Sequence, residues 1–443
     1  MRLFWYICVL SGCAVDALPV TEIDAMLKMR ESITLRDGSP IPCWKSDDPC
    51  TWCNVQCNED QTHVVSLVAN YLNSGMLHPS IGNLTGLQKL ICFRTRMHGN
   101  IPTSIGNLQF LSTLILSNNG FSGQIPQELG QCSSLTILNL SYNSLNGNLP
   151  TSFIPETTQK LFLQHNQLSG SLSPHLFSSL HSLNYIDLSN NKFSGNLPLT
   201  LNQLTKLNFF FGNNNNFQGY MPEFSSGQLK GLDVGYNALQ GSIPQTLETF
   251  SEIRFVFLDH NAFEGPWINS SSWNSLTHLD LSHNHFSGFP ESVFHMPKVT
   301  SLYLSYNHFE GSLFSVTKTT CSSLVYVYAD HNRFSGALPF HWADEFPSLS
   351  FLHLQANNLT GWLSFENKLV QLKSFRVEGN QLTGTCDGPV GKSCLPMHDM
   401  SVDCVDPKGV CEGGVCSQPQ FKSSGPHGTC TTCVLGYCEP TTH

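Results

Sequence analysis

Charged side chains are scarce in this sequence. Lys, Arg, Asp and Glu make up 12% of its 443 residues, whereas about a quarter is typical of soluble proteins. The formal net charge is −10, and both nucleic acids and anionic membranes repel an acidic surface. We therefore expect neither a nucleic acid nor an anionic membrane among the partners of this protein.

Long apolar runs are lacking after the first residues. No later stretch reaches about 18 apolar residues, the length that suggests a membrane-spanning helix, and residues 439–443 are too polar for a lipid-anchor signal. At the start, Arg2 precedes an apolar run from Leu3 to Val15. This pattern is typical of a signal peptide over residues 1–17, with a signal anchor as the alternative. We expect a secreted protein in the extracellular space, the cell wall or at the cell surface, which is not itself transmembrane.

Catalytic motifs are missing as well. The sequence has no Gly-x-Ser-x-Gly elbow, no His-Glu-x-x-His pair and no phosphate-binding loop, and no kinase segment follows. We expect a binding protein rather than an enzyme, with no cofactor and no bound metal. A receptor role would then require a membrane partner, such as a receptor kinase.

What the sequence does contain is a repeat of 22 to 25 residues. Residues 111–126 read LSTLILSNNGFSGQIP and residues 183–198 read LNYIDLSNNKFSGNLP, so the shared frame is LxxLxLxxNxLxGxIP. We count about fourteen repeats over residues 64–385. The Asn of the frame falls at Asn119, Asn143, Asn166, Asn191, Asn215, Asn237, Asn261, Asn284, Asn307, Asn332, Asn357 and Asn380.

Each part of this frame has a physical role. LxLxx alternates apolar and polar residues with a period of two, which predicts a short strand with one buried face. Stacked coils then give one long parallel sheet. A buried Asn must be hydrogen-bonded, so we expect the asparagines to form a ladder that bonds the backbone of adjacent coils. The Gly that follows permits a turn that other residues resist.

The frame resembles the plant-type leucine-rich repeat, found in the ectodomains of plant receptor-like kinases and receptor-like proteins and in polygalacturonase-inhibiting proteins. The resemblance covers about residues 20–395. It implies a leucine-rich-repeat solenoid, a curved right-handed superhelix with one long parallel sheet on the concave face, a second sheet on the flank and disulfide caps. The GxIP element is lost at 265–268, 288–290, 311–314 and 361–364, so we expect a partial second sheet, broken there. Thr95 replaces a ladder asparagine, and we expect that turn to be held less tightly.

The N-terminal end, residues 18–63, resembles the plant cap. Residues 22–33 have helical apolar spacing at Ile23, Met26, Leu27 and Ile33. The cap signature is matched by Cys50, Trp52, Val55 and Cys57, which implies a Cys50–Cys57 disulfide. Cys43 and Cys53 are extra cysteines that would form a second disulfide, and zinc binding by all four is the alternative.

The C-terminal end holds most of the remaining cysteines, which number 17 in the whole chain. Cys386 and Cys394 are similar to the closing cysteine pair of plant ectodomains, a cap at 386–394. Residues 395–443 form a Cys-rich disulfide module whose six cysteines permit 15 pairings, and a redox pair at 430–433 is the alternative to a structural role. We expect buried free thiols at Cys92, Cys132 and Cys321.

The concave face is the expected ligand site. Its x positions point away from the core, so large rings there are not required by the fold, and aromatic residues are favoured at interaction surfaces. The expected ligand-binding residues are Phe209, Phe211, Asp233, Phe255, Phe257, Asp280, Tyr303, Tyr326, Tyr328 and His353. For the aspartates, mere agreement with the repeat consensus is the alternative.

Histidines and glycosylation sequons fall on the same repeats. His165, His260, His283 and His331 precede ladder asparagines, and a metal or pH-sensing site there is the alternative to ordinary surface histidines. The sequence predicts glycosylation at Asn83, Asn139, Asn269 and Asn358. A glycan on Asn139 would block its repeat and move the binding surface toward residues 185–355.

Three functions compete on this basis. The leading hypothesis is a receptor-like binding protein for an extracellular peptide, protein or glycan ligand. The second is an inhibitor of a cell-wall-degrading glycosidase, although the resemblance to polygalacturonase-inhibiting proteins is weakened by the larger number of repeats and the Cys-rich tail. The third is a structural or adhesive matrix protein.

Overall fold

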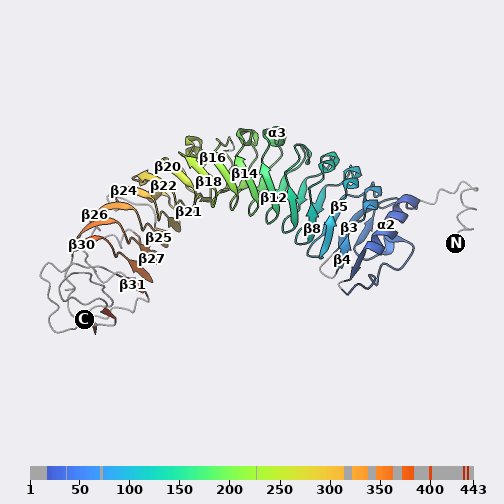
Figure 1. The fold of residues 1–443 in the computed structure, drawn as a ribbon, viewed down its shortest axis with the longest axis horizontal. Helices are drawn as coiled ribbons and strands as arrows, with labels where there is room; N and C mark the ends of the chain where they lie inside the picture. Colours follow the sequence, from blue (N-terminus) through green and yellow to red (C-terminus); the bar gives the residue numbers. More distant parts are fainter. Residues whose placement is uncertain are drawn as a thin grey trace, which may run out of the picture. The chain divides into compact units, whose positions relative to one another are not determined.

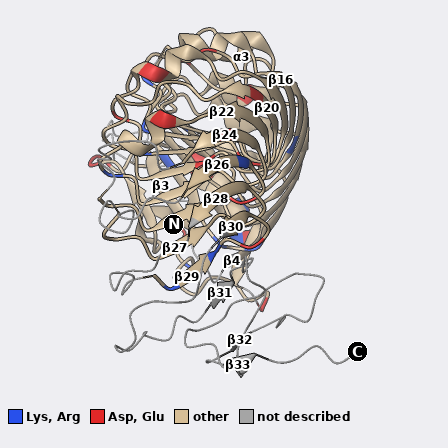
Figure 2. Ribbon diagram, turned by 90° about the vertical axis from the view of Figure 1, so that its left-hand side faces the viewer, with Lys and Arg blue, Asp and Glu red and all other residues tan. Residues whose placement is uncertain are grey.

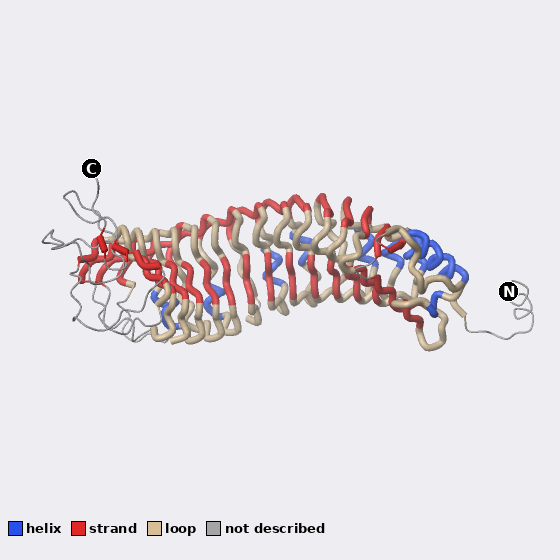
Figure 3. The backbone as a smooth tube through the Cα atoms, turned by 90° about the horizontal axis from the view of Figure 1, so that it is seen from below, coloured by secondary structure: helices blue, strands red, loops and turns tan. Residues whose placement is uncertain are grey.

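The computed structural model describes residues 17–35, 37–69, 73–225, 227–313, 322–337, 346–362, 372–383, 399–401, 433–434 and 437–438. The chain divides into two compact units, Met1–Asn216 and Phe217–His443. Both are built from one kind of coil, in which a strand of a first sheet is followed by a strand of a second sheet and, in most coils, by a short helix. Figure 1 shows these coils stacked within each unit, and Figure 3 shows the strands as two rows.

In the first unit, both sheets start with an antiparallel pair and continue with parallel strands in chain order. The first sheet holds β2 (Val55–Cys57), β3 (Val64–Ala69), β5 (Lys89–Cys92), β7 (Thr113–Ile115), β9 (Ile137–Asn139), β11 (Lys160–Phe162), β13 (Tyr185–Asp187) and β15 (Phe209–Phe211). The second sheet holds β1 (Ile33–Leu35), β4 (Asn73–Met76), β6 (Met97–Asn100), β8 (Gly120–Gly123), β10 (Ser144–Gly147), β12 (Gln167–Ser171) and β14 (Lys192–Asn196). The helices are α2 (Val20–Ser32), α3 (Pro174–Phe177) and the 3₁₀ turns η1 (Pro49–Thr51), η2 (Pro79–Asn83), η3 (Thr103–Asn107), η4 (Gln127–Gln131) and η5 (Leu199–Gln203).

In the second unit, the strands of both sheets are parallel. The first sheet holds β17 (Gly231–Asp233), β19 (Phe255–Phe257), β21 (His278–Asp280), β23 (Ser301–Tyr303), β25 (Tyr326–Tyr328), β27 (Phe351–His353), β29 (Ser374–Arg376) and β31 (Asp399–Ser401). The second sheet holds β16 (Asn216–Tyr220), β18 (Ala238–Gly241), β20 (Ala262–Pro266), β22 (His285–Gly288), β24 (His308–Ser312), β26 (Arg333–Ala337), β28 (Asn358–Trp362) and β30 (Gln381–Thr383). The other elements among its described residues are the turns η6 (Gln245–Thr249) and η7 (Glu291–His295) and the antiparallel pair of β32 (Cys433–Val434) and β33 (Tyr437–Cys438).

The expected breaks in the second sheet do not occur. β20 pairs with β22, β22 with β24, β24 with β26, β26 with β28 and β28 with β30, so this sheet runs through all four repeats that lack the GxIP element. The register of strand pairing in the second sheet explains why the predicted breaks are wrong. The paired residues, such as Gly265 with Phe286 and Pro266 with Ser287, extend no further than the position after the Gly of the element, so loss of the later Ile and Pro leaves the backbone ladder intact.

The fixed apolar positions of the frame form the core of each unit. In the second unit, one such position is taken by four successive phenylalanines, each fully buried: Phe263, Phe286, Phe309 and Phe334. Their ring centroids are 6.1, 5.9 and 6.1 Å apart along the row. Burying one such ring contributes roughly 1.5–3 kcal/mol, so the stacking of coils is strongly favoured.

The asparagines bond one coil to the next. Asn261 is representative: its Oδ1 accepts from Leu239 N at 2.9 Å, and its Nδ2 donates to Val234 O at 2.9 Å and Leu258 O at 3.1 Å. The same two bonds to the backbone of the preceding coil, one accepted by Oδ1 and one donated by Nδ2, are made by Asn119, Asn143, Asn166, Asn191, Asn215, Asn284, Asn307, Asn332, Asn357 and Asn380. Asn237 bonds Phe217 N and Val234 O.

Thr95 is held by the next asparagine of the ladder. Thr95 is fully buried, and its N and Oγ1 both donate to Asn119 Oδ1, at 2.9 and 2.7 Å. Met97 N donates to the same oxygen at 3.1 Å. One amide oxygen thus receives three hydrogen bonds, which compensates in part for the missing amide.

The N-terminal cap contains both expected disulfides, Cys43–Cys53 and Cys50–Cys57. These pairings use all four cysteines of the cap, so the zinc alternative is wrong. Helix α2 forms over the expected residues, but its buried face differs from the prediction, because Glu22 is buried while Ile23 is only partly so.

The buried Glu22 carboxylate joins the cap to the repeats. It accepts a hydrogen bond from Val64 N at 2.9 Å, and its other oxygen lies 2.7 Å from His63 Nδ1. Cys92 and Cys132 are buried free thiols. Cys321, Cys386, Cys394 and residues 1–16, which belong to the predicted signal peptide 1–17, lie outside the described residues. Among the helices that are described, none is long and apolar enough to cross a membrane.

Candidate functional site

The outward positions of the first sheet form straight columns. In the second unit, the central outward residue of each strand lies opposite the next in register: Asp233, Phe257, Asp280, Tyr303, Tyr328, His353 and Arg376. A neighbouring column begins each strand and includes Phe255, Tyr326 and Phe351. Of the ten expected ligand-binding residues, Phe209 and Phe211 lie in the first unit and the other eight in the second.

We name seven of these outward side chains in the second unit the aromatic face: Phe255, Phe257, Tyr303, Tyr326, Tyr328, Phe351 and His353. All are half-buried. Tyr303 and Tyr328 stack at 5.2 Å between ring centroids, Tyr326 and Phe351 at 4.9 Å, and Tyr328 meets His353 edge-on at 4.4 Å. The rings therefore support one another and present a rigid apolar surface.

Asp280 lies within this surface, between Phe257 and Tyr303 in the strand register. Its Oδ1 accepts from Ser282 N at 2.9 Å and from Ser282 Oγ at 2.6 Å. Burial, together with a smaller contribution from the nearby Asp259 carboxylate, raises the pKa of Asp280 to about 6 despite these bonds. Burial also raises the pKa of Tyr303 and of Tyr328. Charge on this face is thus disfavoured by its apolar surroundings.

A second row of rings borders the aromatic face. Tyr236, His260, His283, Tyr306 and His331 each precede a ladder asparagine, and we name them the ring column. Successive centroids lie 4.0, 4.1, 4.4 and 4.1 Å apart, with planes within 19° of parallel. All five have a left-handed backbone, with φ between 52° and 57°.

The histidines of the ring column do not converge on one point, as the ligands of a metal ion would. His260 Nδ1 lies 3.0 Å from Asp259 Oδ2 and His331 Nδ1 lies 2.8 Å from Asp330 Oδ2, while stacking sets the rings side by side. Among the described residues no cluster of three or more metal-type side chains is present. Burial and the neighbouring His260 lower the pKa of His283, which favours its neutral form.

The first unit carries a smaller group of rings on its own outward positions. Tyr185 lies 4.6 Å from Phe162, 5.7 Å from Phe209 and 5.5 Å from Phe211 between centroids. Asp187 is buried beside them, and burial raises its pKa. Tyr185 thus joins Phe162 to Phe209 and Phe211, which are two of the expected ligand-binding residues.

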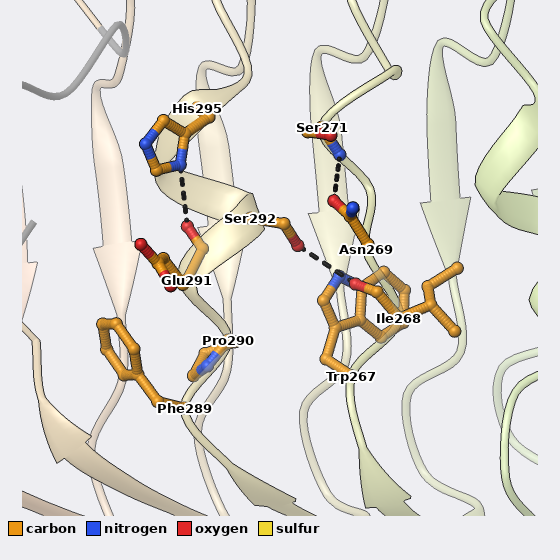
Figure 4. Close-up of a pocket in the computed structure, with 9 residues that line it drawn as sticks. All are labelled: Trp267, Ile268, Asn269, Ser271, Phe289, Pro290, Glu291, Ser292 and His295. Carbon is orange, nitrogen blue, oxygen red and sulfur yellow. Dashed lines mark hydrogen bonds between the residues drawn. The ribbon is translucent and has the colours of Figure 1, made fainter.

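The four sequons occupy different places. Asn139 lies within β9, where its Oδ1 accepts from Ser141 N and Oγ at 3.1 and 2.7 Å. Asn83, Asn269 and Asn358 are exposed. Asn269 also lines a pocket of about 430 Å³ in the second unit, with Trp267, Phe289, Glu291 and His295 among its neighbours, as Figure 4 shows. This pocket was not predicted from the sequence, because its walls come from two different coils.

Family models for the leucine-rich repeat match this chain at residues 110–132, 134–155, 182–204 and 268–309. Among curated proteins of Arabidopsis thaliana, a probable leucine-rich-repeat receptor-like serine/threonine-protein kinase is 35% identical over 100 residues, which is 21% of this chain and 16% of that protein. The receptor-like kinase TMK2 is 30% identical over 98 residues, 22% of this chain and 10% of the kinase. The matched segments thus span less than a fifth of these relatives.

Solved structures of plant ectodomains share the fold. The ectodomain of the Arabidopsis thaliana receptor kinase GASSHO1/SCHENGEN3, in complex with Casparian strip integrity factor 2, has a TM-score of 0.62 and 28% identity, covering 80% of this chain and 44% of that one. PEPR1 with AtPEP1 has a TM-score of 0.61 and 25% identity, covering 82% and 62%. The repeat frame, the disulfide cap, the matching repeat models and the fold of each unit support a plant-type leucine-rich-repeat ectodomain.

Proposed function

We propose that this chain is an extracellular recognition protein of the receptor-like kind, which binds a peptide on the aromatic face of its second unit. The ligand would lie across the first-sheet strands, over Phe257, Tyr303, Tyr326 and Tyr328. The chain would recognise its ligand without performing chemistry on it, and a membrane receptor kinase would carry the signal onward.

The observation that carries this proposal is the set of large rings on outward strand positions. The inward residues of the same strands, Val256, Leu302 and Val327, are buried and already fill the core. Rings on the outer side are therefore not needed for folding. An apolar patch of this kind with polar groups at its border is typical of an interaction surface, and Tyr is enriched among residues that dominate binding energy.

The charge of the face indicates the character of the peptide. Asp280 lies between two rings, and no lysine or arginine of the described residues forms an ion pair with it. Figure 2 shows that charged residues are sparse along the ribbon. A lysine or arginine side chain of a ligand would meet a carboxylate and two aromatic rings together, and both kinds of contact favour a cation.

The related structures support a peptide ligand. One is described as a complex of the plant peptide hormone receptor RGFR1 with RGF2, at 26% identity and a TM-score of 0.59. The ectodomain of GASSHO1/SCHENGEN3 is also in complex with a partner. From these structures we infer only that the ligand of this chain is a peptide, and we do not identify it with any particular hormone.

An array of short peptides and glycans, probed with the purified full chain, tests the proposal. We expect retained peptides to combine Lys or Arg with an apolar residue. Replacing both Tyr326 and Tyr328 by Ala should weaken capture at least about 30-fold, since losing one dominant ring costs roughly 2 kcal/mol or more. Tyr220→Ala, at an exposed ring on the second sheet, is the matched control and should change nothing.

Other outcomes would contradict the proposal. Capture of glycans alone would overturn a peptide ligand. Equal weakening by Tyr220→Ala would show that the aromatic face has no special role. Inhibition of a pectin-degrading glycosidase without peptide capture would favour the inhibitor hypothesis instead.

A further inference from the structure

The pocket beside Asn269 lies apart from the aromatic face and is built by two successive coils of the second unit. Trp267, Ile268 and Asn269 follow β20, whereas Phe289, Pro290 and Glu291 follow β22. Its volume of about 430 Å³ falls at the small end of the range for ligand sites, which suits a few sugar rings better than a long chain.

The aromatic wall of this pocket is held rigidly. Trp267 is buried, and it meets Trp273 and Phe286 edge-on at 5.7 and 5.9 Å between centroids. Its Nε1 donates to Ser270 Oγ at 2.9 Å. Ser292 Oγ, from the neighbouring coil, donates to Ile268 O at 3.0 Å. The pocket is therefore formed before any occupant arrives, which reduces the entropy lost on binding.

The amide of Asn269 lies on the wall of this pocket, in the sequon Asn269-Ser270-Ser271. Its backbone N donates to Glu248 Oε1 at 3.1 Å. Its Oδ1 accepts from Ser271 N at 3.2 Å, as Figure 4 shows. The first bond holds the backbone and the second holds the side chain, while Nδ2 donates no hydrogen bond within the described part of the chain. Asn269 is exposed, so its Nδ2, the acceptor nitrogen for a glycan, is accessible from solvent at the wall of the pocket.

We infer that Asn269 carries an N-linked glycan whose first sugars occupy this pocket. In the attachment step, an oligosaccharide diphospholipid is the donor: the bond from Nδ2 to C1 of N-acetylglucosamine forms as the C1–O bond to the diphosphate breaks. The diphosphate leaves with the electron pair, and the amide loses one proton. The apolar faces of the sugars then pack against Trp267 and Phe289, while Glu291, Ser292 and His295 supply polar partners at the rim.

Attachment makes occupancy possible with weak contacts. A ligand on a short tether has an effective concentration on the order of millimolar, so sugar contacts of millimolar affinity suffice for the glycan to occupy the pocket much of the time. The other exposed sequons, Asn83 and Asn358, do not line this pocket. Asn83 therefore provides an internal control within the same molecule.

The test uses the full chain secreted from a eukaryotic host. Glycopeptide mass spectrometry should find Asn269 occupied. Under native conditions, we expect a peptide N-glycosidase to release this glycan about twofold more slowly than the glycan on Asn83, because a pocket that is occupied about half of the time shields the glycan for that time. After denaturation the two rates should become equal. A bare Asn269, or equal native rates at Asn269 and Asn83, would overturn the inference.

Two variants distinguish the effect of the pocket on the release rate from a general effect of substitution. Phe289→Ser removes a half-buried wall residue and should raise the native release rate at Asn269 to that at Asn83. Tyr220→Ser is the matched control, since Tyr220 also follows the Gly of its repeat but does not line the pocket, and it should leave the rate unchanged. An unchanged rate in Phe289→Ser, with a melting curve that shows folded protein, would refute occupancy of the pocket.

Discussion

Replacing Asn307 by Ala tests the ladder that holds the coils together. Asn307 is 5% exposed. Its Oδ1 accepts from Phe286 N at 3.0 Å, and its Nδ2 donates to Leu281 O at 2.8 Å and to Leu304 O at 3.1 Å. Phe286 and Leu281 belong to the preceding coil, so the side chain is shared between two coils.

The expected loss follows from the groups left without a partner. An unpaired buried backbone group costs about 1–3 kcal/mol, and Asn307→Ala strands at least Phe286 N–H and Leu281 C=O. We expect a loss of roughly 2–5 kcal/mol in the free energy of unfolding. For a unit of about 200 residues, each kcal/mol lowers Tm by about 2–4 °C, so Tm should fall by about 4–20 °C.

Thermal melts followed by circular dichroism measure this effect, and hydrogen exchange at the Phe286 amide locates it. Asn307→Asp keeps the volume and an acceptor but turns a carboxylate toward two carbonyls, so it should not restore stability. Asn274→Ala is the matched control, because Asn274 is exposed and its side chain makes no hydrogen bond with the described residues. A melt of Asn307→Ala that coincides with that of Asn274→Ala would refute the ladder as a source of stability.

Two further predictions concern carboxyl groups, that of half-buried Asp280 and that of buried Glu22. The pKa of Asp280 is raised from 3.8 to about 6, so the stability that its neutral form contributes is present below about pH 4 and is lost as pH rises through about 6. Asp280→Asn should therefore have the same Tm as the wild type near pH 4 and a higher Tm near neutral pH. An Asn fits this position because Asn139 already makes the equivalent bonds to Ser141. A Tm difference that does not change with pH would contradict this. Glu22→Ala leaves Val64 N unpaired and should destabilise the cap by roughly 1–3 kcal/mol, measured as faster hydrogen exchange at Val64, whereas unchanged exchange there would show that Glu22 does not hold the cap.

The features predictable from the sequence are those that a single repeat encodes. The two-residue alternation places Phe257 and Tyr303 outward because strand geometry leaves no other choice. The cap signature likewise implies the Cys50–Cys57 bridge that the structure contains. These inferences need no knowledge of the neighbouring coils.

The features that escaped prediction depend on contacts between repeats. Glu22 is charged, so its polarity alone argued for exposure, yet Val64 N and His63, distant in sequence, satisfy it in a buried position. The second sheet continues without Ile and Pro because its register is set by backbone groups near Gly265 and Gly288. The pocket at Asn269 is likewise invisible within one repeat, since Phe289 lies in the following coil.

The ring column shows how the fold and the recognition surface share one backbone feature. The residue before each ladder asparagine has a positive φ, a conformation that costs an ordinary residue roughly 1–2 kcal/mol. Asn tolerates this region best and is found there at Asn118, Asn190 and Asn214, all in the first unit.

In the second unit the same position holds Tyr or His in five successive coils, each stacked on the next at 4.0–4.4 Å. An aromatic pair contributes about 0.5–1.5 kcal/mol, which is comparable to the backbone strain that each ring brings. The ladder asparagines fix the turn whatever residue precedes them, so a strained position becomes free to carry rings. The ring column therefore forms a continuous row beside Asp259, Asp280 and Asp330, at the border of the surface to which we assign the ligand.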